Sequence, residues 1–328
     1  MTQSKNLINI FGPTASGKTK LSIELAKSLI SKGLKAEVIN FDSLLFYKEL
    51  NIGTAKPTQH EMEGVRHHFV GTQSISSPIN SSHFVSISKP IIAQLITEGT
   101  LPILVGGSGF YLRALLKGMY SSDEPREKTN KLENIKFAEI LDKNDKANNE
   151  ELINFLKKND PESLENIHQN DFYRLSRAVE YFTINNKKLS LQKKELDAKN
   201  PYNFEENLSL NVSPLNLYTF PEKNAHLEII LNRTKDMIKN GLIEEVKDLL
   251  AQGFDKTLKP LNSIGYKETI NFIFSKSENK DELIEKINIS TRQLAKSQKT
   301  FFKKVTPKTM IDPLEDINKN IEKIFTLL

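Results

Sequence analysis

Three short apolar runs stand out in the first third of the chain, at residues 7–11, 36–41 and 101–105. Their length and composition are typical of buried strands. Residues 20–31 and 110–116, by contrast, carry apolar side chains at helical spacing. Strands that alternate with helices predict an α/β fold, in which a parallel sheet is flanked by helices.

The pattern changes after Tyr120. Residues 121–200 are rich in Lys, Glu and Asn and contain no clear strand. This segment is predicted to be a helical insertion domain, which divides a catalytic core made of residues 1–120 and 201–328. The apolar side chains that recur in it at helical spacing are Phe137, Ile140, Leu141, Leu152, Ile153, Phe155 and Leu156.

The second part of the core begins with more short apolar runs. Residues 207–220 predict one further strand of the first sheet. From Asn224 onward the pattern is helical to the end of the chain.

Eight residues after the first predicted strand fit the pattern G-x-x-x-x-G-K-[ST] of a phosphate-binding P-loop. A strand, a glycine loop and a helix in this order point several backbone N–H groups and the helix dipole at one place, where a di- or triphosphate binds. Lys18 would reach the outer phosphate oxygens, and the Thr19 hydroxyl would bind Mg²⁺. The core is therefore predicted to be P-loop NTPase-like. The expected diphosphate-binding residues are Gly12, Thr14, Ala15, Ser16, Gly17, Lys18 and Thr19.

Two other loops follow the second and third predicted strands. Asp42 and Ser43 end the second strand, which we expect to lie beside the P-loop strand, and Gly106–Gly109 follow the third. Because ligands of parallel sheets bind beyond the carboxyl ends of the strands, all three loops should face one crevice. Asp42 could hold Mg²⁺ through water, accept a proton, or form an ordinary cap or turn. The glycines would let a ligand approach the backbone, although glycine turns are common after strands.

Several basic and imidazole side chains are candidates for other roles. Arg174 and Arg177 lie on one face of a predicted helix and suit phosphate contacts, but a solvated basic face explains them equally well. His67 and His68 are adjacent, so they cannot both face one metal from a regular element; a structural or loop role is favoured. A second basic face, on an amphipathic helix, carries Arg292, Lys296 and Lys299.

The composition excludes several classes of protein. The absence of cysteine excludes disulfides, thiolate catalysis and cysteine-type zinc sites, and it fits a cytoplasmic enzyme. No stretch approaches the ~20 apolar residues of a membrane span, and the first residues lack the layout of a signal peptide. The formal charge of +5 permits an anionic partner without indicating one.

Several strings along the chain together resemble one family, the tRNA isopentenyltransferases, also called tRNA dimethylallyltransferases, of the bacterial type. A P-loop kinase would share the first string and not the others. The strings occur in the family order: GPTASGKT at 12–19, Asp42-Ser43 followed by Tyr47, NIGTAKPT at 51–58, LVGGSGFYLRALL at 104–116, HQNDFYRLSRAVE at 168–180, IGYKE at 264–268 and TRQLAK at 291–296.

The resemblance implies that a dimethylallyl group is transferred from its diphosphate to N6 of the adenine on the 3′ side of the anticodon in tRNA. It implies that Asp42 accepts the amine proton, that Thr19 and Mg²⁺ act at the diphosphate, and that Arg233 clamps it. The adenine must leave its stack to react. A monomer in the cytoplasm, with no membrane partner, is expected. The implied contacts with the tRNA anticodon arm are Asp42, Ser43, Leu44, Leu45, Ser108, Tyr173, Arg174, Leu175, Ser176, Arg177, Gly265, Tyr266, Lys267, Arg292 and Lys296.

The chain departs from the family pattern at four positions. Ile230 stands in place of the first of two arginines in the helix at 227–233. Ser297 and Phe301 replace an arginine and a tryptophan, and Leu45 stands where glutamine is common. We expect these departures to affect tRNA affinity and efficiency.

Three other functions are open from the residues alone. They are a P-loop nucleotide kinase, an isopentenyltransferase acting on free adenine nucleotides, and an RNA-binding protein without activity. The strings after the P-loop count against the kinase, and Arg174 and Arg177 favour tRNA over free nucleotides. Loss of activity is disfavoured because four residues are intact: Lys18, Thr19, Asp42 and Arg233.

Overall fold

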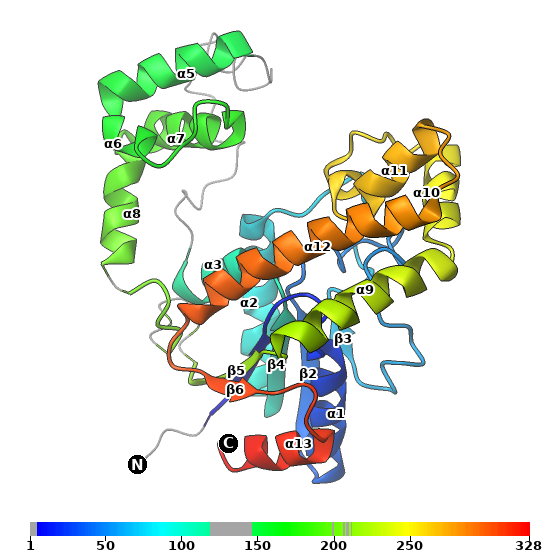
Figure 1. Cartoon of the computed structure of the whole chain (residues 1–328). Helices are drawn as coiled ribbons and strands as arrows, with labels where there is room; N and C mark the ends of the chain where they lie inside the picture. Colours follow the sequence, from blue (N-terminus) through cyan, green and yellow to red (C-terminus); the bar gives the residue numbers. More distant parts are fainter. Residues whose placement is uncertain (1–4, 119–145, 199, 206, 208–209, 211) are drawn as a thin grey trace. The chain divides into compact units, whose positions relative to one another are not determined.

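The structure is a computed structural model that describes residues 5–118, 146–198, 200–205, 207, 210 and 212–328. The chain forms two compact units. One comprises Met1–Leu116 and Tyr202–Leu328, and the other comprises Lys117–Pro201 (Figure 1). The first unit contains the sheet, whereas the helices α5 to α8 are the secondary structure described in the second.

The sheet has six parallel strands in the order β3-β2-β4-β1-β5-β6. The predicted α/β class with a parallel sheet is therefore confirmed. One expectation is wrong: β4 lies between β1 and β2, so the strand before Asp42 is not beside the P-loop strand. The strands are β1 (Leu7–Phe11), β2 (Lys35–Asn40), β3 (His67–His68), β4 (Thr100–Gly106), β5 (Pro214–Thr219) and β6 (Thr309–Ile311).

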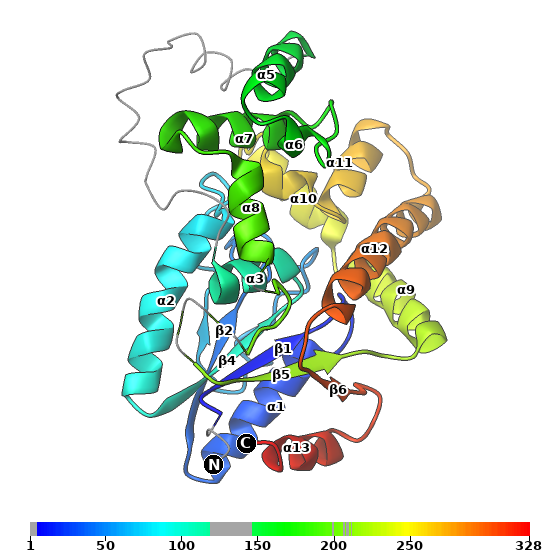
Figure 2. The same cartoon turned by 90° about the vertical axis from the view of Figure 1, so that its left-hand side faces the viewer.

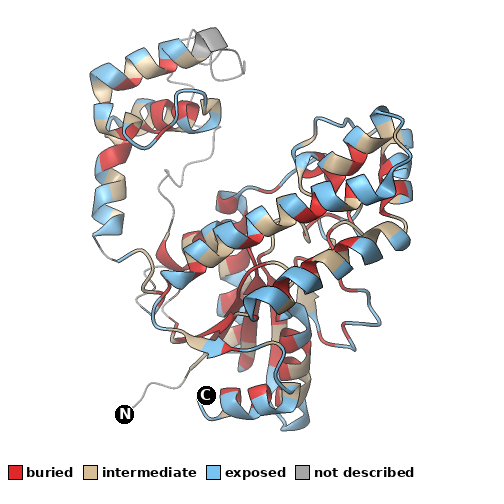
Figure 3. Cartoon of the chain, in the orientation of Figure 1, coloured by how far each residue is buried: buried red, intermediate tan, exposed pale blue. Residues whose placement is uncertain are grey.

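Helices pack on both faces of the sheet because strand side chains alternate in direction. Ile8 and Ile10 belong to a buried cluster that includes residues of α1 and α13. On the other face, Phe11 stacks on Phe302 of α12 with 5.0 Å between the ring centroids. Figure 3 shows that the central strands β1, β4 and β5 are almost wholly buried between these layers. The helices of this unit are α1 (Lys18–Ser31), α2 (Ser81–Thr97), α3 (Gly109–Lys117), α9 (Lys223–Lys239), α10 (Leu242–Ala251), the 3₁₀ turn η2 (Lys259–Asn262), α11 (Tyr266–Phe274), α12 (Lys280–Lys303) and α13 (Ile317–Phe325).

The prediction that the chain is helical from Asn224 to its end is wrong at one place. Residues Thr309–Ile311 form β6, which pairs with β5 in parallel. The strand is only three residues long, and its central Met310 is 45 % exposed. Such a short edge strand carries no hydrophobic period that a sequence pattern could reveal.

A second apolar cluster lies among α10, α11 and α12. Leu242 and Val246 of α10, Tyr266 of α11 and Ile287 of α12 are all buried in it. This cluster fixes the helices that carry several candidate site residues.

The helical unit has its own apolar cluster. Leu152 and Leu156 of α5 pack with Leu175 and Val179 of α7. The buried Asp160 joins two other helices, since it accepts hydrogen bonds from the hydroxyls of Ser163 (2.6 Å) and Ser190 (2.5 Å). The predicted positions Phe137, Ile140 and Leu141 lie outside the described residues. The helices, seen from another side in Figure 2, are α5 (Lys146–Asn159), α6 (Pro161–Leu164), α7 (Phe172–Asn185) and α8 (Leu189–Asp197).

None of the helices in the described ranges combines the length and the apolar character that crossing a membrane requires.

Candidate active site

The P-loop connects β1 to the first turn of α1. Ala15 and Gly17 adopt the left-handed conformation, with φ of 58° and 72°. Alternation of this kind in a glycine loop turns successive backbone N–H groups toward one point, as in an anion-binding nest. Thr19 is exposed in the first turn of α1. Its hydroxyl is therefore open to a ligand of the loop.

Close packing beneath the loop fixes its path. A Cβ atom on Gly12 would lie only 2.3 Å from Thr219 Oγ1 on β5, so no other residue fits there. Ser16 was predicted to bind the diphosphate, but its side chain is buried and points back into the protein. Its hydroxyl donates to the Pro13 carbonyl (2.8 Å) and lies 2.7 Å from the Thr219 hydroxyl. The Ser16 side chain therefore holds the loop, and only its backbone can face a phosphate.

Lys18 is buried at the base of the loop. Its ammonium group donates to the Pro13 carbonyl at 2.5 Å, which leaves two further N–H donors. Burial lowers the pKa of Lys18 to about 8; the nearby Asp42 carboxylate opposes this shift and the Arg233 guanidinium adds to it. The three charged groups therefore act on one another at one place.

Asp42 follows β2 and is half-buried. Its backbone N–H donates to Asn40 Oδ1 (2.9 Å), and its own Oδ1 accepts a long bond from the Leu44 N–H (3.3 Å). A Cβ atom on Gly107 would lie 3.4 Å from Asp42 Oδ2, so this second oxygen faces the loop after β4. One carboxylate oxygen thus shapes the turn, while the other faces the neighbouring loop.

Arg233 reaches this place from α9. Its Nη2 donates to the Thr54 carbonyl at 3.0 Å. Burial lowers the pKa of Arg233, and the Asp42 carboxylate opposes that effect. The structure therefore brings together Lys18, Asp42 and Arg233, from three segments far apart in the sequence.

Two residues that the sequence analysis did not select hold Thr14. The Thr14 N–H donates to Gln298 Oε1 of α12 (2.7 Å), and the His226 Nε2–H of α9 donates to the Thr14 carbonyl (2.8 Å). Burial also lowers the pKa of His226, which favours the neutral ring. Thr14 was predicted to bind the diphosphate, but its N–H is already engaged. Gln298 lies two residues after the end of the TRQLAK string, whereas no sequence signal points to His226.

The loop at residues 51–54 is held from the other side by α10 and α11. Glu245 accepts hydrogen bonds from the N–H groups of Ile52 (2.7 Å) and Asn51 (3.1 Å) and from the Tyr266 hydroxyl (2.6 Å). Tyr266 is fully buried, and burial together with Glu245 raises its pKa. It was predicted to contact tRNA; the structure places its side chain inside the protein, where it supports the loop.

The remaining candidates in this unit differ in exposure. Ser43, Leu44, Leu45 and Ser108 are half-buried around the strand ends, whereas Lys267 and Lys296 are exposed. Gly265, at φ 92°, caps α11 and is buried. Arg292 forms an ion pair with Glu285 of its own helix (3.2 Å).

The helical unit carries the other predicted tRNA contacts on α7. Arg174 pairs with Asp171 at 2.7 Å, and Arg177 pairs with Glu180. Leu175 was also predicted to contact tRNA; its side chain is fully buried and packs in the core of the unit. Ser176 is also buried, and its hydroxyl donates to the Tyr173 carbonyl (3.0 Å).

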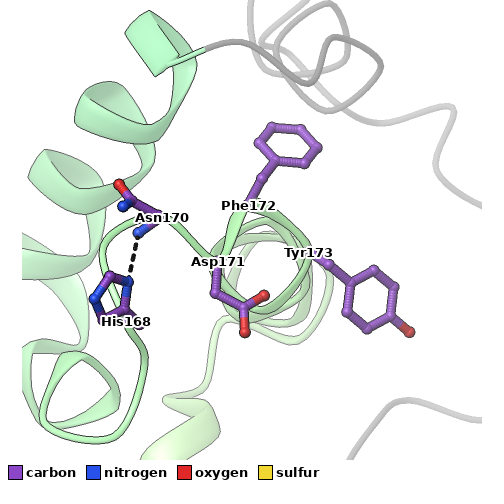
Figure 4. A pocket seen from close by; sticks show the side chains of 5 residues that line it. All are labelled: His168, Asn170, Asp171, Phe172 and Tyr173. Carbon is purple, nitrogen blue, oxygen red and sulfur yellow. Dashed lines mark hydrogen bonds between the residues drawn. The ribbon is translucent and has the colours of Figure 1, made fainter. Parts of the chain in front are cut away.

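A surface hollow of about 500 Å³ lies at the start of α7. Figure 4 shows the Tyr173 ring pointing away from His168, whose Nδ1 accepts from the Asn170 N–H at 3.2 Å. Tyr173 is 65 % exposed. The residues that line the hollow are His168, Asn170, Asp171, Phe172 and Tyr173.

His67 and His68 form the short edge strand β3. His68 Nε2 lies 2.6 Å from Glu37, and His67 Nδ1 lies 2.8 Å from the Val65 carbonyl. Within the described ranges there is no group of three or more His, Asp or Glu side chains that could hold a metal.

Comparison with known proteins identifies the family. The family model described as IPP transferase matches residues 45–305. The chain belongs to the IPP transferase family. It is 34 % identical over 326 residues to a tRNA dimethylallyltransferase of Acetivibrio thermocellus, with 97 % of this chain and 96 % of that protein covered.

Solved structures of IPP transferases also match over almost the whole chain. A tRNA delta(2)-isopentenylpyrophosphate transferase from Staphylococcus epidermidis has a TM-score of 0.66 at 31 % identity, and 99 % of each chain is covered. A eukaryotic dimethylallyltransferase, described as acting on tRNA, has a TM-score of 0.78 at 26 % identity, covering 98 % of this chain and 78 % of that one. The family and the P-loop-like fold predicted from the sequence are therefore confirmed.

Proposed function

We propose that this protein transfers a dimethylallyl group from dimethylallyl diphosphate to N6 of the adenine that follows the anticodon in tRNA. The observation that carries this proposal is the shared environment of Lys18, Asp42 and Arg233 beside the P-loop. Two cations and a ring of loop amides suit a diphosphate, and a carboxylate beside them suits a proton transfer. The names of the relatives support the same activity.

The reaction would proceed by displacement at the allylic carbon. The N6 lone pair forms the new C–N bond while the C–O bond breaks, and its electron pair leaves with the diphosphate. The Asp42 carboxylate accepts the proton that N6 loses. Lys18, the P-loop amides and Arg233 stabilise the negative charge that develops on the leaving oxygens.

The residues present fit a Mg²⁺ ion bound with the diphosphate. Mg²⁺ commonly keeps several waters and takes only one or two protein ligands together with substrate phosphates. The exposed Thr19 hydroxyl and the absence of a carboxylate cluster in the described residues agree with that kind of site. A bound ion would neutralise charge on the diphosphate. We also propose that the monomer is the active form, because Lys18, Asp42 and Arg233 already lie together within a single chain.

The test is direct. The purified protein is incubated with dimethylallyl diphosphate, Mg²⁺ and unmodified tRNA, and the nucleosides are then analysed by mass spectrometry. We expect dimethylallyl adenosine, and none from the same tRNA with guanine at the target position. Robust ATP turnover stimulated by a nucleoside monophosphate, without prenyl transfer, would instead indicate a kinase.

The role of Asp42 has its own prediction. Asp42→Asn keeps the size of the side chain and removes its basicity, so turnover should fall by about 10²–10⁴, the usual effect of losing a general base. Binding of tRNA should change little. Asp236→Asn, at an exposed position of α9, is the control and should retain turnover. Near-normal turnover in Asp42→Asn would show that Asp42 is not the base and that its role is to form the turn through its bond to Leu44.

A further inference from the structure

Gln298 on α12 connects two loops that follow different strands. Its Oε1 accepts from the N–H of Thr14 in the P-loop (2.7 Å), and its Nε2 donates to the carbonyl of Gly107 after β4 (2.9 Å). The strands before these loops are neighbours, with Phe11 paired to Gly106. The Gln298 side chain therefore links the loop after β1 to the loop after β4 by two hydrogen bonds.

The Gly107 backbone lies directly between Gln298 and Asp42. A Cβ atom on Gly107 would be 2.6 Å from Gln298 Nε2 and 3.4 Å from Asp42 Oδ2. A side chain at this position would displace the Gln298 amide from its hydrogen bond. Two hydrogen bonds therefore join the P-loop to Gly107 through Gln298, and the Asp42 carboxylate borders the space above the same glycine.

The other side of the P-loop is held independently. His226 of α9 donates to the Thr14 carbonyl, whereas the Thr14 N–H donates to Gln298 of α12. The N–H and the C=O of Thr14 are therefore bonded to two different helices. His226 contacts only the P-loop here, whereas Gln298 contacts both the P-loop and Gly107, in the loop that Asp42 Oδ2 faces.

We infer that Gln298 is a positioning residue, which sets the spacing between the diphosphate-binding loop and the base Asp42. This inference rests on the proposed function, in which the leaving diphosphate and the proton acceptor must be correctly placed at the same time. Misplacement of a reacting group by about 1 Å can cost on the order of a hundredfold in rate. Gln298 performs no chemistry itself and acts through Thr14 and Gly107.

The variant Gln298→Met separates hydrogen bonding from packing. Methionine has a similar length, but it cannot donate to Gly107 and is only a weak acceptor. We expect kcat for prenyl transfer to fall about ten- to a hundredfold, with the KM for tRNA and the melting temperature close to those of the wild type. Affinity for inorganic pyrophosphate, measured by calorimetry, should also fall. Gln252→Met, an exposed glutamine at the end of α10, is the matched control and should change neither.

Hydrogen exchange gives a readout that does not depend on activity. The Thr14 amide should exchange faster in Gln298→Met than in the wild type, because it loses its acceptor. Unchanged kcat, pyrophosphate affinity and Thr14 exchange in this variant would overturn the inference. Wild-type protein that binds pyrophosphate but transfers no dimethylallyl group would contradict the proposed function instead. In that case the pyrophosphate and exchange measurements still decide whether Gln298 orders the loop.

Discussion

Ile230 lies one helical turn before Arg233 on α9, but the two side chains have different surroundings. Ile230 is 2 % exposed, whereas Arg233 donates to the Thr54 carbonyl at the site. Ile230→Arg would therefore bury a cation without a partner, and we expect it to lower the free energy of unfolding by several kcal/mol. Thermal unfolding measures this effect.

Position 230, where the family usually has arginine, also tests whether an arginine there can act at the site. An arginine at 230 should fail to restore activity to Arg233→Ala, since the side chain at 230 faces the core. Asn232→Arg, at an exposed position of the same helix, should melt close to the wild type. A stable Ile230→Arg protein that rescues Arg233→Ala would show that α9 can turn position 230 toward the site.

The lowered pKa of Lys18 predicts that the affinity for a diphosphate depends on pH. Burial lowers its pKa to about 8 in the free protein. The ammonium form is needed to bind the diphosphate, so affinity should fall as the pH rises through this value, by about tenfold between pH 7 and pH 9. Calorimetry with inorganic pyrophosphate measures the change. Lys18→Arg keeps its charge throughout and corrects for the titration of pyrophosphate itself; an equal pH dependence in both proteins would contradict the prediction.

At the scale of elements, Glu245 of α10 determines the conformation of the loop at residues 51–54. Glu245→Ala would remove the acceptor of three short hydrogen bonds. Their donors are the backbone N–H groups of Asn51 and Ile52 and the Tyr266 hydroxyl. We expect a loss of roughly 2 kcal/mol or more in unfolding free energy, since bonds to charged groups contribute about 1.5–3 kcal/mol. Turnover should fall as well, because the Thr54 carbonyl of this loop holds Arg233.

Glu244 provides the control for this change. It lies beside Glu245 in the first turn of α10, so both carboxylates interact similarly with the helix dipole, but Glu244 is exposed. Urea unfolding of Glu244→Ala and Glu245→Ala should separate the loop contact from the dipole effect. Equal stabilities would show that the loop does not depend on Glu245.

The sequence predicted the elements that carry a strong local signal. The strand at 7–11 coincides with β1, and the P-loop pattern located the start of α1, since buried runs and glycine spacing are local properties. The strand order and β6 were not predicted, because pairing joins distant segments and β6 is too short to show a period. For the same reason Gln298 and His226 were missed: their roles follow from contacts with a residue more than 200 positions away.

At the scale of the whole molecule, the helical unit and the sheet unit can be tested separately. Arg174 and Arg177 lie on α7 and pair with carboxylates of their own helix. An exposed pair such as Arg174–Asp171 contributes only about 0–1 kcal/mol, so a tRNA phosphate can replace the carboxylate. The double variant with alanine at both positions should weaken tRNA binding and reduce the salt slope by about one for each phosphate that the arginines no longer neutralise.

Pyrophosphate binding is the control for the double variant, since the P-loop belongs to the other unit. It should stay at the wild-type value. Titrations of tRNA at several salt concentrations provide the slope. A slope equal to that of the wild type would mean that both arginines serve only their own helix.

The bond between Thr14 and Gln298 spans 284 positions of the chain, and this separation affects how the protein is made. At a translation rate of roughly 5–20 residues per second, about 15 to 60 seconds pass between the synthesis of the two residues. The P-loop therefore leaves the ribosome long before α12 exists to hold it. A nascent or prematurely released chain that stops before α12 contains the whole phosphate-binding motif but not the contact that orders Thr14. Full affinity for a diphosphate is therefore expected only near the end of synthesis, when α12 is complete.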